Sequence, residues 1–160
     1  MKKIFIILFM FLLFSCGNDI QTIENNQEIL KTKKILSLGD SLTAGYGLDI
    51  LESYPSKLQE SLKIEGYNYE VINAGVSGNT SDDLLSRIKL YDDDYDIVII
   101  VIGGNDGLRG NSLVNLEKNI QEIIDYFEGK NTKIVLGGLK QLPLNLGLNY
   151  IKEFTLVYEN

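Results

Sequence analysis

The sequence contains no histidine and no tryptophan, and it has only two prolines and one cysteine among its 160 residues. A single cysteine excludes an internal disulfide, and the usual zinc sites need histidines or paired cysteines that this chain lacks. Positive charge is also scarce, because 15 Lys and Arg stand against 22 Asp and Glu, a formal net charge of −7. A nucleic-acid partner is therefore not expected, since phosphate-binding surfaces need clustered Lys and Arg.

Length and composition are those of one globular domain. Hydrophobic residues make up 44% of the chain and charged residues 23%, a balance that argues against intrinsic disorder. A chain of 160 residues also leaves no room for two domains of ordinary size. We therefore expect a single folded unit.

The N-terminal segment has the pattern of an export signal. Two lysines precede an unbroken apolar run from Ile4 to Phe14. This run is shorter than the ~20 residues that a membrane-spanning helix needs, and it matches the apolar region of a secretory signal peptide. The ending LFSC resembles a bacterial lipobox, in which Cys16 becomes the lipidated first residue of the mature protein. In a plain signal peptide, Cys16 would be incidental.

From this pattern we expect a signal peptide over residues 1–15, a lipidated Cys16 and a polar tether over residues 16–32. The protein would then be exported to the bacterial cell envelope. A lipid anchor would hold it to a membrane without a membrane-spanning helix.

The rest of the sequence alternates strand and helix signals. Short apolar runs predict four buried strands, over Lys33–Gly39, Asn68–Gly75, Tyr95–Gly104 and Thr132–Leu139. Helical periodicity predicts helices in SYPSKLQESLKIEG, TSDDLLSRIKL and SLVNLEKNIQEIIDYFEG, and LNYIKEFTLVYE begins a further one. Ser53 is the expected cap of the first helix, and Thr80 or Ser81 that of the second.

Strands that are apolar on both faces and alternate with amphipathic helices predict a parallel sheet covered by helices on both sides. The fold class is therefore α/β, a three-layer α/β/α arrangement. We expect the sheet to be flavodoxin-like, with strand order 2-1-3-4. The pattern stops on a helix at Asn160, which leaves the strand Thr132–Leu139 as an uncovered edge of the kind that natural sheets avoid. We therefore expect residues 33–160 to form an incomplete domain, with the last strand and helix missing.

Three loops that follow predicted strands carry residues able to do chemistry, at positions 39–42, 75–79 and 103–106. Ligands of open α/β sheets bind beyond the carboxyl ends of the strands, where the winding direction reverses. If the first strand lies between the second and third, the three loop tips converge, because neighbouring strands are ~4.8 Å apart. A hydroxyl, an unobstructed backbone N–H and a carboxamide are together the parts of an acyl-transfer site with an oxyanion hole.

The segments GDSLTAGYG, NAGVSGNTS and GGNDGLRG, followed by LPLNLGLNY, resemble the blocks of the GDSL (SGNH) hydrolase family, most of all its bacterial thioesterase, lysophospholipase and arylesterase group. The resemblance implies that Ser41 is the nucleophile and also an oxyanion donor through its backbone N–H. It implies that the N–H of Gly78 and the side-chain amide of Asn105 are the other donors. The family's Asp and His, which form a D-x-x-H block, have no counterpart here. The resemblance implies no metal and no cofactor.

Each of these residues also has a purely structural interpretation. Ser41 could form a turn or cap a helix, and Gly78 could serve only to permit a tight turn. Asn105 could satisfy the backbone of its own loop, as Asn often does after a strand.

Five further residues in or near these loops could take part in the site or support it. Asp40 and Asp106 fit a structural role, in which each holds its loop by hydrogen bonds. Arg109 either lies near the substrate or faces solvent, and Tyr46 either lines an acyl channel or packs. Lys140 is the remaining cation that could act as a base for Ser41, across the third strand.

Three functions follow from the sequence. The first is a carboxylic-ester hydrolase acting on lipid or small-molecule esters, inactive or weak in this chain because the Asp and His are absent. The second is a catalytically silent ligand-binding lipoprotein that retains the esterase pocket. The third, a mononucleotide binder, has little support, since the loop after the first strand has neither a P-loop lysine nor a G-x-G-x-x-G pattern.

Overall fold

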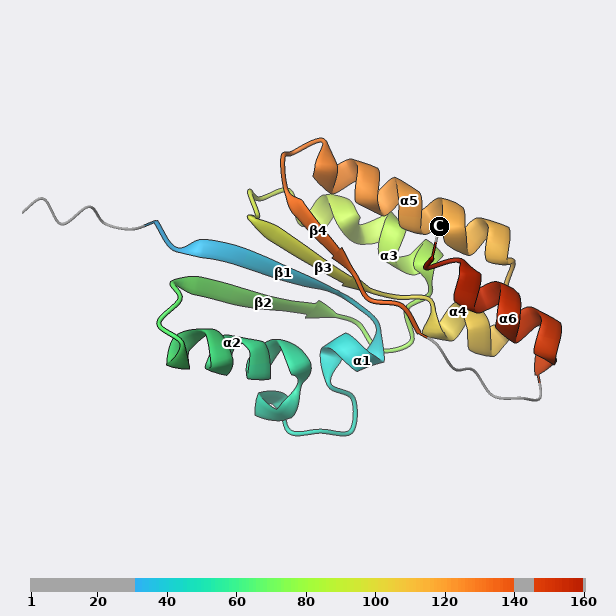
Figure 1. The fold of residues 1–160 in the computed structure, drawn as a ribbon, viewed down its shortest axis with the longest axis horizontal. Coiled ribbons are helices and arrows are strands. Elements are labelled where there is room, and N and C mark those ends of the chain that lie inside the picture. The colour runs from blue at the N-terminus through green and yellow to red at the C-terminus, as the bar shows by residue number, and fades with distance from the viewer. Residues whose placement is uncertain (1–30, 140–145, 160) are drawn as a thin grey trace, which may run out of the picture.

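The computed structural model describes residues 31–139 and 146–159. The expected signal peptide, Cys16 and nearly all of the tether lie outside the described residues, as does Lys140. Within the described part, four parallel strands form one sheet in the order β2-β1-β3-β4 (Figure 1). The strands are β1 (Lys33–Gly39), β2 (Tyr69–Gly75), β3 (Ile97–Val101) and β4 (Lys133–Leu136). The predicted fold class and strand order are confirmed.

Helices cover the sheet on both sides, with α1 and α2 against one face and α3 and α5 against the other (Figure 1). The α-helices are α1 (Ser41–Ala44), α2 (Tyr54–Ile64), α3 (Ser81–Arg87), α4 (Gly104–Arg109), α5 (Leu113–Glu128) and α6 (Leu148–Leu156). Two 3-10 turns, η1 (Ile50–Glu52) and η2 (Ile88–Leu90), precede α2 and follow α3. Among the helices in the described ranges, none has both the length and the apolar character that crossing a bilayer requires.

The short helices α1 and α4 have no counterpart in the prediction. Their lengths, four and six residues, are too small for a 3.6-residue period to be visible in the sequence. The third strand is correspondingly shorter than expected. Its predicted end, Gly104, begins α4 because Gly103 adopts a left-handed conformation with φ of 108° and turns the chain out of the sheet.

The two expected helix caps differ in how they work. Thr80 caps α3 in a capping box, in which its hydroxyl accepts from the N–H of Asp83 and the Asp83 carboxylate accepts from the N–H of Thr80. Ser53 occupies the cap position of α2 but makes no capping hydrogen bond. Its hydroxyl donates instead to the carbonyl of Ile50, at a distance of 3.0 Å.

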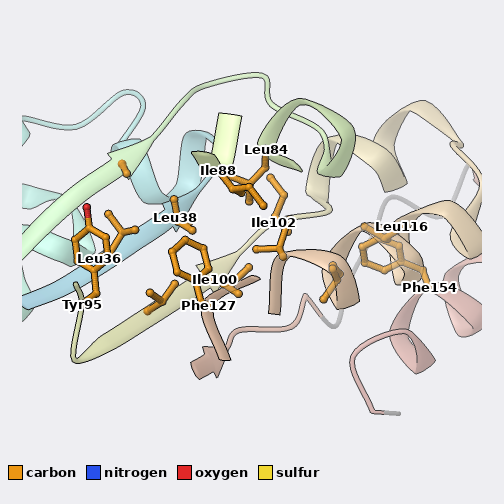
Figure 2. Packing of buried hydrophobic residues seen from close by; sticks show 14 residues of the cluster. Leu36, Leu38, Leu84, Ile88, Tyr95, Ile100, Ile102, Leu116, Phe127 and Phe154 are labelled. Carbon is orange, nitrogen blue, oxygen red and sulfur yellow. The ribbon is translucent and has the colours of Figure 1, made fainter. Parts of the chain in front are cut away.

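The hydrophobic core lies between the sheet and the helices α3 and α5, and it extends to Phe154 on α6. Alternate strand residues from β1 and β3 meet a stripe of large side chains on α5 (Figure 2). The fully buried members are Leu36, Leu38, Leu84, Val98, Ile100, Ile102, Leu116, Ile123, Phe127 and Phe154. The opposite face is covered less completely, since Val135 on the edge strand β4 is 51% exposed.

Candidate active site

The three predicted loops leave the sheet at one edge and at one level. In the strand register, Gly39 is paired with Gly75 on β2 and with Val101 on β3. Because β1 lies between β2 and β3, the loop after β1 is flanked by the other two. The sequence predicted this arrangement from the order of the strands.

The first loop places Ser41 at the start of α1. The carboxylate of Asp40 caps this helix and accepts from the N–H of Leu42 at 3.0 Å. Ser41 is the first helical residue and is partly exposed. Amides of the first helical turn have no partner within the helix, so the N–H of Ser41 is of the kind that can donate to an anion. Asp40 has the structural role expected from the sequence.

The second loop depends on a glycine at position 78. Gly78 has φ of 86°, a left-handed conformation that a side chain would strain. A Cβ built at this position would meet nothing within 4 Å, so the surface above its backbone is open. Gly78 thus permits the turn before the Thr80 cap, and no atom lies within 4 Å of where its side chain would be, while its role as a donor stays a prediction.

The third loop is joined to the second by hydrogen bonds. The Nδ2 of Asn105 donates to the carbonyl of Asn79 at 2.9 Å, and Nη2 of Arg109 donates to the carbonyl of Gly78 at 3.0 Å. Asn105 therefore does not serve only its own loop. An amide nitrogen carries two hydrogens, and among the described residues the Asn105 side chain uses one of them in this bond. Arg109 is bound to the Gly78 peptide, so it is not merely a solvent-facing side chain.

A buried network fixes the third loop to the helices behind it. The carboxylate of Asp106, which is 2% exposed, accepts from the N–H and the hydroxyl of Ser81, both at 2.8 Å. Nδ2 of Asn119 donates to the Ser81 hydroxyl at 3.0 Å. This network ties α4 to α3 and α5, so Asp106 also has the structural role that the sequence predicted.

Arg87 is part of the site and sequence reasoning missed it. Its Nη2 donates to the carbonyls of Gly39 and Ala74, at 3.1 and 3.0 Å, and its Nε donates to Oδ1 of Asn79 at 2.7 Å. Arg87 therefore connects the ends of β1 and β2 to the Gly78–Asn79 loop. In the sequence it is a basic residue in the last turn of a helix, where a solvated cation is ordinary, so no signal distinguished it.

The remaining candidates lie elsewhere. Tyr46 is 80% exposed and does not pack into the described structure. An acidic run at positions 92–94 lies at the amino ends of the strands, where Asp93 binds Lys34 and Asp92 binds Lys130. A cavity of about 430 Å³ lies beside this run. This cavity lies at the amino ends of the strands, whereas Ser41 follows the carboxyl end of β1, so we do not assign the cavity to the site.

The first and third loops lie close together, and the charge of Asp106 on the third acts on Asp40 on the first. A Cβ on Gly104 would lie 3.3 Å from Oδ2 of Asp40. Burial raises the pKa of the Asp40 carboxyl above its ordinary 3.8; the hydrogen bond from Leu42 opposes this shift, and the charge of Asp106 adds to it. A raised pKa in the folded state means that ionised Asp40 is less stable there than in the unfolded chain.

This shift predicts a pH dependence of stability. Because the folded state binds the proton more tightly, the contribution of Asp40 to the free energy of unfolding decreases as the pH rises from about 4 through the folded pKa. The variant Asp40→Asn keeps an oxygen for the Leu42 N–H and cannot ionise. Urea denaturation at a series of pH values should show wild type losing stability relative to this variant as the pH rises, and the opposite slope would contradict the assignment.

Comparison with known proteins gives a family for this arrangement. Residues 37–155 match the model of the GDSL-like Lipase/Acylhydrolase family. The esterase TesA of Pseudomonas aeruginosa is 40% identical over 126 residues, which cover 78% of this chain and 62% of TesA. An arylesterase of Vibrio mimicus is 35% identical over 129 residues, which cover 79% of this chain and 64% of the arylesterase.

Comparison with solved structures gives the same family. The crystal structure of AlinE4, an SGNH-hydrolase family esterase, is 42% identical and superimposes with a TM-score of 0.76. The match covers 81% of this chain and 70% of AlinE4. The chain spans less than two thirds of the length of the two curated relatives, TesA and the arylesterase.

Proposed function

Since the chain belongs to the GDSL-like lipase/acylhydrolase family, we propose that its site acts on carboxylic esters through Ser41. The observation that carries this proposal is the convergence of three loops at one edge of the sheet. The loop of Gly78 is bonded to Arg109 on α4 at 3.0 Å, and its neighbour Asn79 is bonded to Asn105 at 2.9 Å. Ser41 begins α1, directly after β1, the strand that lies between β2 and β3.

The proposed reaction is acyl transfer in two steps. The Ser41 hydroxyl attacks the ester carbonyl carbon, the carbonyl oxygen becomes an oxyanion, and the alcohol leaves to give an acyl-enzyme. The N–H groups of Ser41 and Gly78 and the second N–H of the Asn105 amide donate to the oxyanion. Water then attacks the acyl-enzyme and releases the carboxylic acid. Arg87 and Arg109 hold the loop that carries the second donor.

The proton of Ser41 needs a base, and the printed sequence contains no histidine. A serine hydroxyl is a poor nucleophile unless a neighbouring base takes its proton. Loss of the base from a serine hydrolase lowers kcat by ~10⁶ and leaves ~10³–10⁴ over water, from the oxyanion hole and binding. We therefore propose that these 160 residues bind and position an ester but turn it over slowly.

An acyl-trapping experiment tests the nucleophile. Incubation with p-nitrophenyl acetate is expected to leave an acetyl group on Ser41, because the activated ester acylates a weak nucleophile while hydrolysis of the acyl-enzyme lacks a base. Mass spectrometry of proteolytic peptides locates the group. The variant Ser41→Ala should lose it, and Ser77→Ala, an exposed serine in the Gly78 loop, should keep it. Acetylation that is equal in all three chains would exclude Ser41.

We also propose where the protein works and on what. The apolar run from Ile4 to Phe14 and the following Cys16 support export and a lipid anchor. Export argues against acyl-CoA substrates, which are cytosolic, and favours esters of lipids or of small molecules in the cell envelope.

The absence of histidine from the printed sequence favours a second candidate, a catalytically silent lipoprotein that uses the same pocket to capture a ligand. Such a protein would need the three loops as they are, because they shape the pocket, but would need no base. It predicts ligand binding without Ser41 acetylation, which separates it from the esterase.

A further inference from the structure

Large apolar side chains are exposed from α1 through the following turn to η1, directly after the proposed nucleophile. We call this group the apolar turn. Its members and exposed fractions are Leu42 (53%), Tyr46 (80%), Leu48 (61%), Ile50 (76%) and Leu51 (69%). Isolated exposed apolar residues are ordinary on protein surfaces, but so many in one short segment mark an interaction surface.

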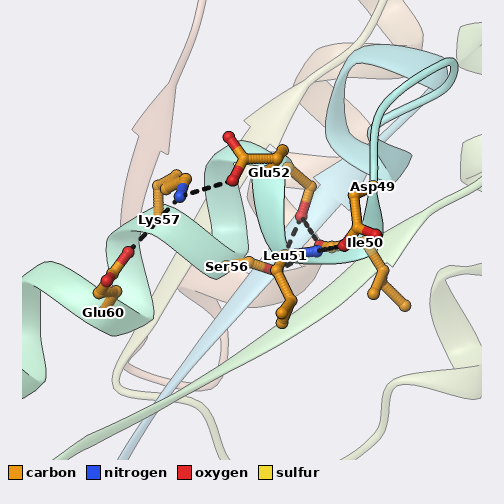
Figure 3. A network of polar contacts seen from close by, with 8 residues as sticks. Asp49, Ile50, Leu51, Glu52, Ser56, Lys57 and Glu60 are labelled. Carbon is orange, nitrogen blue, oxygen red and sulfur yellow. Dashed lines mark hydrogen bonds and ion pairs between the residues drawn. The ribbon is translucent and has the colours of Figure 1, made fainter.

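The backbone beneath the apolar turn is held firmly. The carboxylate of Asp49 accepts from the N–H of Leu51 at 3.0 Å, and the carbonyl of Ile50 accepts from the hydroxyls of Ser53 and Ser56, at 3.0 and 2.8 Å. Figure 3 shows the side chains of Ile50 and Leu51 directed away from this network. The exposure of the apolar turn is therefore built into the fold and does not come from a loose loop.

Charge is kept at the base of the apolar turn. The acid in η1, Glu52, binds Lys57 on α2 at 3.0 Å, and Lys57 also reaches Glu60 at 3.6 Å (Figure 3). Asp49 is occupied as the cap of η1. The apolar side chains therefore project from a surface whose acidic groups are already bound to protein partners.

We propose that the apolar turn docks on a phospholipid surface. The sequence outside the described residues points to this occupant, because a tether over residues 16–32 follows the expected lipid anchor at Cys16. Such an anchor would keep the domain within reach of the bilayer, and tethering raises the effective concentration of the lipid surface, so that even a weak apolar contact would form. Tyr46 adds an aromatic ring with a polar tip, a type of side chain enriched at membrane–water interfaces.

The dimensions allow both contacts at once. The tether enters the domain at Lys33, the amino end of β1, whereas the apolar turn follows the carboxyl end of this strand and lies beside α1 and the start of α2 (Figure 1). The seven residues of β1 span about 23 Å, and the tether reaches up to roughly 60 Å when extended. Docking would bring Ser41 to the lipid surface, because Leu42 is its neighbour, but it does not depend on the proposed hydrolysis.

The absence of tryptophan from the sequence makes a direct test possible. In the full chain, the variant Ile50→Trp places a single fluorescent reporter in the apolar turn. The variant Ile64→Trp is the matched control, since Ile64 is also 76% exposed and lies at the opposite end of α2. Each chain is bound to phosphatidylcholine vesicles with brominated acyl chains, which quench tryptophan only at contact.

We expect the fluorescence of the Ile50→Trp chain to shift to shorter wavelength and to be quenched several-fold more strongly than that of the Ile64→Trp chain, since a docked apolar surface enters the bilayer by ~5–10 Å. Adding Leu51→Asp to Ile50→Trp should remove the difference. Equal quenching of both reporters would overturn the proposal. A shift of the Ile50→Trp fluorescence to shorter wavelength without vesicles would also overturn it, because protein would then cover the apolar turn. An equal shift on adding a monomeric single-chain ester would overturn it as well, because the apolar turn would then be an acyl-chain subsite.

Discussion

Imidazole added to the purified chain is expected to raise the rate of p-nitrophenyl acetate hydrolysis. This increase should depend on Ser41, and without imidazole the hydrolysis should be barely detectable. The printed sequence supplies no histidine, and a missing base costs a serine hydrolase ~10⁶ in kcat. A small base that diffuses next to a partly exposed Ser41 can recover part of this factor. The rate is followed as nitrophenolate release at increasing imidazole concentration.

Imidazole also cleaves this ester directly, so the variant Ser41→Ala measures the background under the same conditions. The oxyanion hole is tested on the rescued rate, which Asn105→Ala should lower by ~10²–10³. Asn115→Ala, an exposed amide on α5, should leave it unchanged. A rescue that is equal in wild type and Ser41→Ala would refute the nucleophile. Ligand binding with no rescue at all would favour the silent lipoprotein.

Gly39→Ala is expected to destabilise the domain by about 3 kcal/mol, at the upper end of the range for overpacking. A Cβ at this position would lie 2.1 Å from Oγ1 of Thr43 and 2.3 Å from the carbonyl oxygen of Val101. Thr43 is fully buried and the other atom belongs to the backbone of β3, so neither can move cheaply. The measurement is urea denaturation.

The matched control for this clash is Gly129→Ala. Gly129 at the end of α5 has φ of −57°, and a Cβ there would make only ordinary contacts, 3.4 Å from the carbonyl oxygen of Asp125 and 3.8 Å from that of Tyr126. Such a substitution changes stability by no more than about 1 kcal/mol and tends to raise it, because the unfolded chain loses freedom. Equal losses for Gly39→Ala and Gly129→Ala would show that close packing of α1 on the sheet is not what requires Gly39.

The elements that the sequence predicted best are those whose signal is local and repeated. The bounds of β1 agree with the prediction at both ends, because Lys33–Gly39 is an apolar run that is closed by glycine. The stripe on α5 was visible because Leu116, Ile120, Ile123 and Phe127 recur with helical spacing, and all four are buried. The helices α1 and α4 escaped because their few residues contain less than two turns.

By itself the sequence determined the α/β class and the three loops that carry Ser41, Gly78 and Asn105, because apolar period and glycine-bounded loops are properties of neighbouring residues. The strand order was predicted from likeness to a flavodoxin-like sheet, since no local pattern fixes which strands are neighbours. Only the tertiary structure decided which groups hold these loops together. Arg87 lies 48 residues from Gly39, and Asn105 lies 26 residues from Asn79. A hydrogen bond between segments so far apart leaves no pattern in a single sequence, since each partner's role depends on where the fold brings the other.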